Sequence, residues 1–146
     1  MATDQNPGRT RDVSYVPGGD RAGGARDAFN TARTMFQRGQ LGTARMAFRN
    51  FLQRYPSDAL VPDAHYFLAD ILVQEEKPEE AVHAFLEIPT LFPTSDRAAE
   101  AYYRVGVIYM SQNDMDDAIA YLVRVVETYP GSESAAAAQD RLDEIR

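Results

Sequence analysis

The stretch from Pro62 to Pro93 reads PDAHYFLADILVQEEKPEEAVHAFLEIPTLFP, and it decides the fold of this 146-residue chain. Two apolar helical patterns are joined by a short polar turn, and an aromatic residue followed by proline ends the second pattern. A fixed period of about 20–50 residues is the signature of a solenoid, in which each repeat buries its apolar face against its neighbours. Here the second half recurs 37 residues upstream and downstream, in the pairs Ala44/Phe48, Ala81/Phe85 and Ala118/Leu122 and in Tyr55-Pro56, Phe92-Pro93 and Tyr129-Pro130.

This period divides the chain into an N-terminal segment and three helix pairs. Residues 1–24 carry two Pro and five Gly and have few apolar side chains. Burial cannot offset the entropy of ordering such a segment, so we predict a flexible linker. The rest is predicted to be one all-α domain over 25–146, with three helical-pair repeats at about 25–57, 58–94 and 95–131 and a capping helix at 132–146.

Local signals place the ends of the helices. The residue before a proline is pushed out of the α region, so each aromatic-proline pair should end a helix. Ser95 and Asp114 are expected N-caps, because short polar side chains accept hydrogen bonds from the first free backbone N–H groups. Gly131 should end the third pair in the left-handed conformation, and Gly39 and Gly42 should bracket the first turn.

Small and apolar residues recur on one face of each predicted helix. Phe85 lies at the centre of the second repeat's stripe and is the expected core residue. Small residues at equivalent positions, Ala32, Ala69 and Gly106, should let the paired helices approach closely. The stripe of the first helix is predicted to comprise Ala28, Thr31, Ala32 and Met35.

The composition bounds the function as well as the fold. The chain has no Cys, which excludes disulfides, Cys-type zinc sites and thiol nucleophiles. It has no run of 18 apolar residues and no apolar segment near its start, so we expect neither a membrane span nor a signal peptide. The net charge of −7 divides into +5 over residues 1–55 and −12 over 56–146. Such an acidic body argues against nucleic acid as a partner.

Few groups suit catalysis. Glu79, His83 and Glu87 share one helix face, but zinc usually takes His or Cys from more than one element. We therefore interpret this face as solvated and paired at i,i+4 spacing. His65 is expected to be a packed histidine at the edge of the core. Because no Ser-His-Asp order or HExxH motif occurs, we expect no enzyme, no metal site and no cofactor.

The apolar spacing resembles the tetratricopeptide repeat, whose pattern is W-x2-L-G-x2-Y…A-x3-F…P. Repeat three matches best, through Tyr102, Val105, Gly106, Tyr109, Ala118, Leu122 and Pro130. The resemblance implies a right-handed superhelix with the first helix of each pair on its concave face. The 37-residue period and the segments AFRNFLQRYP, DAHYFLAD, AYYRVGVIY and YPGSESAAAAQDRL are similar to the C-terminal domain of the Tol–Pal-associated family YbgF/CpoB.

That second resemblance covers about residues 26–145 and implies a periplasmic, non-enzymatic adaptor. It would bind TolA or the peptidoglycan-synthesis machinery and couple peptidoglycan synthesis to outer-membrane constriction in cell division. Family members carry a trimerising coiled coil, which residues 1–24 do not resemble, so we expect a monomer and leave the oligomeric state open. The alternatives are an outer-membrane assembly adaptor like BamD, which is longer and has a lipidated Cys, and a cytosolic tetratricopeptide adaptor.

The resemblance also implies which positions line the groove, namely the fifth, ninth and twelfth of each repeat. The fifth is aromatic in all three, which predicts a ladder suited to an amphipathic helix or an extended peptide of mixed charge. We expect Asp63 and Asp70 to face the Arg-bearing first repeat. Alternatives are that these aromatics stack sugars, or that they pack between helices and meet no ligand. The predicted partner-binding residues are Phe29, Arg33, Phe36, Tyr66, Asp70, Val73, Tyr103, Val107 and Met110.

Overall fold

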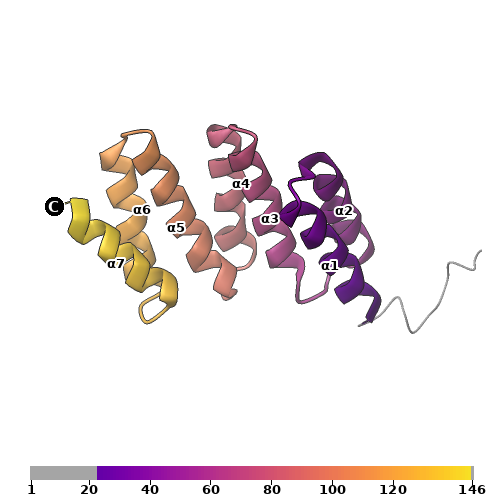
Figure 1. Ribbon diagram of the computed structural model, residues 1–146. Helices are drawn as coiled ribbons and strands as arrows, with labels where there is room; N and C mark the ends of the chain where they lie inside the picture. The colour runs from indigo at the N-terminus through magenta and orange to yellow at the C-terminus, as the bar shows by residue number, and fades with distance from the viewer. Residues whose placement is uncertain (1–22, 146) are drawn as a thin grey trace, which may run out of the picture. The chain divides into compact units, whose positions relative to one another are not determined.

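The computed structural model describes residues 23–145, and every regular element in that range is a helix (Figure 1). First helices end at Gln37, Gln74 and Ser111, a spacing of 37 residues, which confirms the prediction of three helix pairs and a terminal helix. Residues 1–22 of the predicted linker lie outside the described range, and Gly24 already belongs to the first helix. The helices are α1 (Gly24–Gln37), α2 (Leu41–Arg54), α3 (Val61–Gln74), α4 (Pro78–Leu91), α5 (Asp96–Ser111), α6 (Met115–Thr128) and α7 (Glu133–Ile145).

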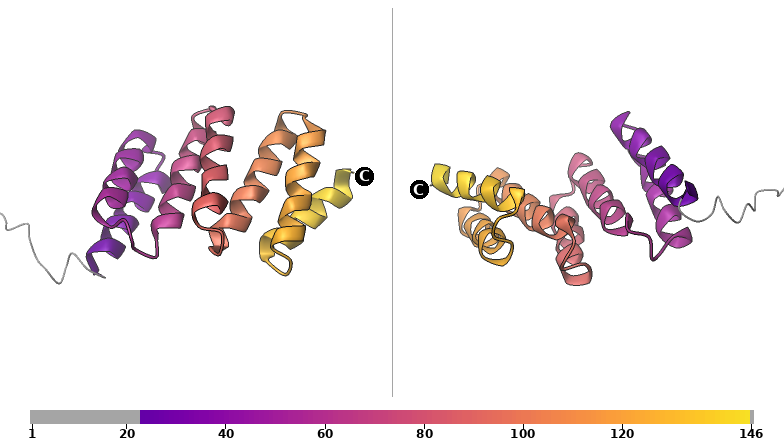
Figure 2. Two further views of the ribbon diagram at one scale, coloured as in Figure 1. Left: turned by 180° about the vertical axis from the view of Figure 1, so that it is seen from behind. Right: turned by 90° about the horizontal axis from the view of Figure 1, so that it is seen from below.

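The helices form two compact units, unit 1 ending at Leu60 and unit 2 beginning at Val61. Unit 1 holds α1 and α2, which pack against each other. Unit 2 holds the helix pairs α3–α4 and α5–α6, followed by α7 (Figure 1). Because α5 contacts both α3 and α7, these three helices form one row, and α4 and α6 lie on one side of it (Figure 2). That residues 25–146 act as a single domain stays a prediction.

The core of unit 2 has two parts. One lies among α3, α4 and α5 and is centred on Phe85, which is fully buried together with Ala81 and Ile88. The other joins α6 to α7 and contains Leu122 and Val125. The predicted stripes of the second helices are therefore confirmed in unit 2. In unit 1 the equivalent residues Ala44, Phe48 and Phe51 are buried as well.

The helix ends follow the predicted chemistry. Each second helix stops directly before its aromatic-proline pair, at Arg54, Leu91 and Thr128. At the start of α5, the Ser95 hydroxyl accepts a hydrogen bond of 3.1 Å from the Arg97 backbone N–H. Ser132 caps α7 in the same way, accepting from the Ala135 N–H at 3.0 Å, and Gly131 has the expected positive φ of 85°.

Two details differ from the predictions. Gly42 lies inside α2, and the left-handed residue of the turn is Gly39, with φ of 78°. In α1 the buried residues are Ala25, Phe29 and Ala32, whereas Thr31 is exposed and Ala28 and Met35 are half-buried. The reason is the size of Phe29, since a helix that buries one phenylalanine removes far more apolar surface from water than one that buries alanine.

Substitution of glycine by alanine is expected to have opposite effects on stability at Gly106 and at Gly42. A Cβ at Gly106 would lie 2.9 Å from two carbons of the buried Leu122 side chain, whereas a Cβ at Gly42 meets nothing within 4 Å. We expect Gly106→Ala to lower the free energy of unfolding by about 1 kcal/mol, because overpacking outweighs the gain in helix propensity. Gly42→Ala should instead raise it by about 0.5–1 kcal/mol. Urea denaturation measures both, and a stabilised Gly106→Ala would contradict the close approach of α5 and α6.

Candidate functional site: the tyrosine groove of unit 2

A groove of about 700 Å³ lies along the row of first helices in unit 2. We call it the tyrosine groove, because three tyrosines line it: Tyr66 of α3, Tyr103 of α5 and Tyr129, which directly follows α6. Its charged lining residues are Asp96, Glu100, Arg104 and Glu133. The groove thus combines aromatic surface with charges of both signs, which suits recognition of a peptide more than a reaction centre.

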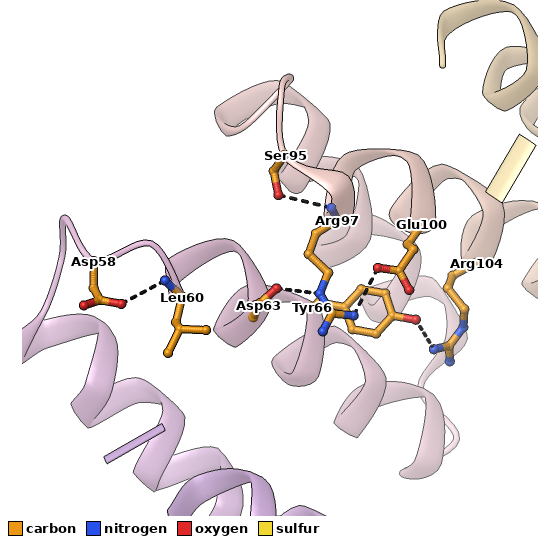
Figure 3. A network of polar contacts seen from close by, with 8 residues as sticks. All are labelled: Asp58, Leu60, Asp63, Tyr66, Ser95, Arg97, Glu100 and Arg104. Atoms are coloured by element: carbon orange, nitrogen blue, oxygen red, sulfur yellow. Dashed lines mark hydrogen bonds and ion pairs between the residues drawn. The ribbon is translucent and has the colours of Figure 1, made fainter. Parts of the chain in front are cut away.

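Two arginines of α5 hold Tyr66 in place (Figure 3). Arg97 lies over the Tyr66 ring, with its guanidinium carbon 4.5 Å from the ring centroid. It donates hydrogen bonds to Asp63 at 2.5 Å and to Glu100 at 3.1 Å. Arg104 donates to the Tyr66 hydroxyl at 3.0 Å and to Asp70 at 2.6 Å. These contacts tie α5 to α3 and hold one wall of the groove in place.

The electrostatics keep both arginines charged. Burial lowers the pKa of Arg104, but the hydrogen bond to Asp70, the interactions with Tyr66 and the charge of Asp70 outweigh it, so the pKa lies above its usual value. The pKa of Arg97 is likewise raised: burial lowers it, and the contacts with Asp63 and Glu100 more than compensate. Both guanidinium groups therefore stay charged over the whole physiological pH range.

The second tyrosine of the groove is held in a related way. Arg141 of α7 donates a hydrogen bond of 3.2 Å to the Tyr103 hydroxyl. Arg141 and Tyr103 are 38 residues apart, the same separation as Arg104 and Tyr66. The hydroxyls of Tyr66 and Tyr103 are thus each bonded to an arginine 38 residues later. Tyr129, which also lines the groove, instead donates a hydrogen bond from its hydroxyl to the Pro93 carbonyl at 3.0 Å.

The structure brings together part of the predicted site. Tyr66 and Tyr103 line the tyrosine groove, and Asp70 anchors Arg104 beside it. Asp63 and Asp70, which we expected to face the first repeat, have partners in the third repeat instead, Arg97 and Arg104. The cause is that α3 packs against α5, so a residue of α3 lies beside one 34 positions later.

The other predicted site residues do not line the tyrosine groove. Phe29 is only 3% exposed and packs edge-to-face against Phe48 and Phe51, each ring 5.7 Å away, so the packing alternative applies to it. Val73 and Met110 pack against the two core clusters of unit 2. The rest are half-buried or exposed: Phe36, Val107, and Arg33, which donates to Asn30 at 3.2 Å.

Sequence reasoning missed the arginines that organise the groove. A signal existed, because Asp63 and Asp70 are seven residues apart on α3, and Arg97 and Arg104 are seven apart on α5. Residues at i and i+7 share one face of a helix, so two such matched pairs indicate that the two faces meet.

We expect His65 to make the stability of the fold depend on pH. Its ring lies 5.5 Å from that of Phe92, and burial lowers the pKa of His65, partly countered by the charge of Glu87. A lowered folded-state pKa means that the unfolded chain binds the proton more readily, so stability should be full above 6.5 and fall as the pH drops below it. Urea denaturation about one pH unit above and below this value measures the change. His65→Phe should remove it, and His83→Gln should not.

Two further features of residues 23–145 bear on function. No group of three or more His, Asp or Glu side chains in this range is placed to hold a metal ion. No helix in the same range is both long enough and apolar enough to cross a membrane.

The family of the chain follows from its sequence as a whole. The model of the family YfiO, described as an outer membrane lipoprotein, matches residues 21–146. The chain belongs to the YfiO family. This family match supports the BamD-like alternative of the sequence analysis and leaves the YbgF/CpoB assignment unconfirmed. No curated protein matches this YfiO-family chain in sequence.

Solved structures of low sequence identity share the fold of this YfiO-family chain. The Yersinia enterocolitica type III secretion chaperone SycD, in complex with a peptide of the translocator YopD, has a TM-score of 0.66 at 11% identity, over 84% of this chain and 89% of SycD. The N-terminal domain of stress-induced protein-1 from C. elegans has a TM-score of 0.63 at 16% identity, over 86% and 98%. The TPR domain of P58(IPK) scores 0.59 at 16% identity, over 82% and 33%. The likeness confirms the tetratricopeptide fold.

Proposed function

We propose that the chain is a non-enzymatic adaptor of the bacterial cell envelope that binds a segment of a partner protein in the tyrosine groove. The observation that carries this proposal is the groove itself, about 700 Å³ in volume and formed by three helices. Tyr66 and Tyr103 are already held by arginines, so little entropy of these two side chains is lost on binding. The SycD structure supports the proposal by analogy, because that protein was solved with a bound peptide.

An envelope location is supported by the family, whose members are described as outer membrane lipoproteins. In the envelope, we place the repeats on the periplasmic side, where they would meet other envelope proteins. The absence of catalytic motifs from the sequence supports an adaptor over an enzyme. We further propose that the chain acts as a monomer.

Two finer roles follow from the sequence, and they differ in the partner. The family match favours an adaptor of outer-membrane assembly, as in BamD. The resemblance to YbgF/CpoB favours a role with Tol–Pal in cell division, where the partner would be TolA-like or part of the peptidoglycan-synthesis machinery. The partner found in the groove decides between these two roles.

Site-directed photocrosslinking in living cells tests the adaptor proposal. A photoreactive amino acid at Ala137, which lines the tyrosine groove, should crosslink a defined envelope protein. The neighbouring residue Ala136 is exposed and does not line the groove, so the same amino acid there is the matched control. Mass spectrometry of the crosslinked product identifies the partner. Equal crosslinking from both positions, or none from Ala137, would overturn the groove as the binding site.

A further inference from the structure

Consecutive repeats of unit 2 place equivalent residues 37 positions apart, and one contact is repeated between them. Arg104 holds the Tyr66 hydroxyl, and Arg141 holds the Tyr103 hydroxyl. Each residue of the second contact is one period after its counterpart in the first. At this contact, α7 is therefore related to α5 in the same way that α5 is related to α3.

A second contact of this kind is not repeated. Arg97 lies over the Tyr66 ring and pairs with Asp63. One period later, the counterparts of Tyr66 and Asp63 are Tyr103 and Glu100, but the counterpart of Arg97 is Ser134. Within residues 23–145, no arginine lies over the Tyr103 ring as Arg97 lies over that of Tyr66. The position that a guanidinium would take between the Tyr103 ring and the Glu100 carboxylate is therefore not filled by a residue of the repeat.

The charged residues that line the groove carry a net negative charge. Three carboxylates line the tyrosine groove, those of Asp96, Glu100 and Glu133, and the charge of the lining Arg104 is already neutralised by Asp70 at 2.6 Å. Glu100 shares Arg97 with Asp63, and its side chain remains 41% exposed. Asp96 and Glu133 are exposed and have no ion-pair partner within the described part of the chain. A cation entering the groove would therefore meet Asp96 and Glu133, and Glu100, which has only a share of the charge of Arg97.

We propose that the tyrosine groove binds an arginine side chain of the partner segment, over the Tyr103 ring and paired with Glu100. This proposal rests on the proposed adaptor function and names the chemistry that the groove selects. Arginine fits better than lysine, because its planar guanidinium stacks on a ring and donates to a carboxylate at the same time. The internal template is Arg97, which makes both contacts one repeat earlier.

Binding of short peptide pools to the full chain tests the proposal. Fluorescein-labelled pools share a fixed central residue, which is Arg, Lys, Gln or Glu, between randomised flanks. Fluorescence anisotropy should show the Arg pool binding about tenfold more tightly than the Gln pool, and the Glu pool weakest. Glu100→Gln should remove the preference for Arg. Asp140→Asn, which removes one charge outside the groove, should keep it.

Ser134→Arg provides a second, independent test, because it supplies the missing guanidinium from the chain itself. This variant should raise Tm by about 2–4 °C and weaken binding of the Arg pool about tenfold, whereas Ser134→Ala should do neither. A Ser134→Arg variant that binds the Arg pool like wild type would overturn the assignment of this place.

The outcomes separate the two proposals. Groove binding that does not distinguish Arg from Gln overturns the arginine assignment and leaves the adaptor function standing. Crosslinking that fails at Ala137 overturns the groove as the binding site of the proposed adaptor. A wild-type dimer in sedimentation that Ser134→Arg converts to monomer would show that a second copy of this chain occupies the groove, which overturns the assignment to a different partner.

Discussion

Replacing Phe85 with alanine is expected to lower the free energy of unfolding by about 3–5 kcal/mol, the largest effect of any single substitution considered. Phe85 is fully buried in the core cluster among α3, α4 and α5. Its ring packs edge-to-face against Tyr66, with centroids 5.4 Å apart, and the Arg104 guanidinium lies 5.0 Å from its centroid. Alanine would lose the transfer free energy of the ring and leave a cavity beneath the wall of the tyrosine groove.

Urea denaturation followed by circular dichroism measures this effect. Leu91→Ala is the matched control, because Leu91 lies on the same helix but is 57% exposed, and its loss should cost about 0.5 kcal/mol or less. The unfolding transition of Phe85→Ala should also broaden, since repeats of a solenoid are coupled through their interfaces. Equal costs for the two variants would show that Phe85 does not fill the centre of this core.

The fold could be predicted from sequence because each local signal, such as a helix stop or a tight turn, occurs three times at the same spacing. The sterics of proline and the threefold recurrence of an aromatic-proline pair together predict stops at Tyr55, Phe92 and Tyr129, and the structure ends α2, α4 and α6 directly before them. Gly39 has Glu76 and Asn113 as counterparts with φ of 62°, so a left-handed turn recurs although only one of the three residues is glycine. The 37-residue period therefore predicts the left-handed residue of each turn even where that residue is not glycine.

Local rules fail where packing overrides them. Pro89 lies inside α4 and is buried, although proline removes one backbone donor from a helix. The helix continues only to Leu91, and the Thr90 hydroxyl donates a hydrogen bond to the Leu86 carbonyl at 3.2 Å. Pro89 is tolerated at this position because it lies in the last turn of α4, where few helical hydrogen bonds remain to be lost. Its burial in the core offsets the lost backbone donor.

The site was harder to predict than the fold for a physical reason. Whether the fifth position of a repeat meets a ligand or a neighbouring helix depends on side chains from other elements. Phe29 packs on Phe48 much as Tyr66 packs on Phe85, but Phe29 is only 3% exposed. Tyr66 and Tyr103 line the groove, and each carries a hydroxyl that an arginine bonds. The repeat pattern alone treats these three aromatics as equivalent and cannot separate them.

Removing Arg104 is expected to have the second largest effect, lowering the free energy of unfolding by about 2 kcal/mol in Arg104→Ala. The side chains of Arg104 and Asp70 are only 24% and 17% exposed, so the variant would leave a poorly solvated carboxylate without its cation. It would also free the Tyr66 hydroxyl and so loosen the groove wall. Binding of the Arg pool should therefore weaken together with stability.

Arg124→Ala is the matched control for this prediction. Arg124 also donates to a tyrosine hydroxyl, that of Tyr102, but over a longer 3.4 Å and at an exposed site. Its loss should cost about 0.5 kcal/mol or less. In a double-mutant cycle, Asp70→Asn and Arg104→Ala should couple by about 1 kcal/mol or more, because each removes the other's partner. Additive costs would show that the pair does not link α3 to α5. The groove would then need a ligand to order it, and tight binding of a single arginine would lose its physical basis.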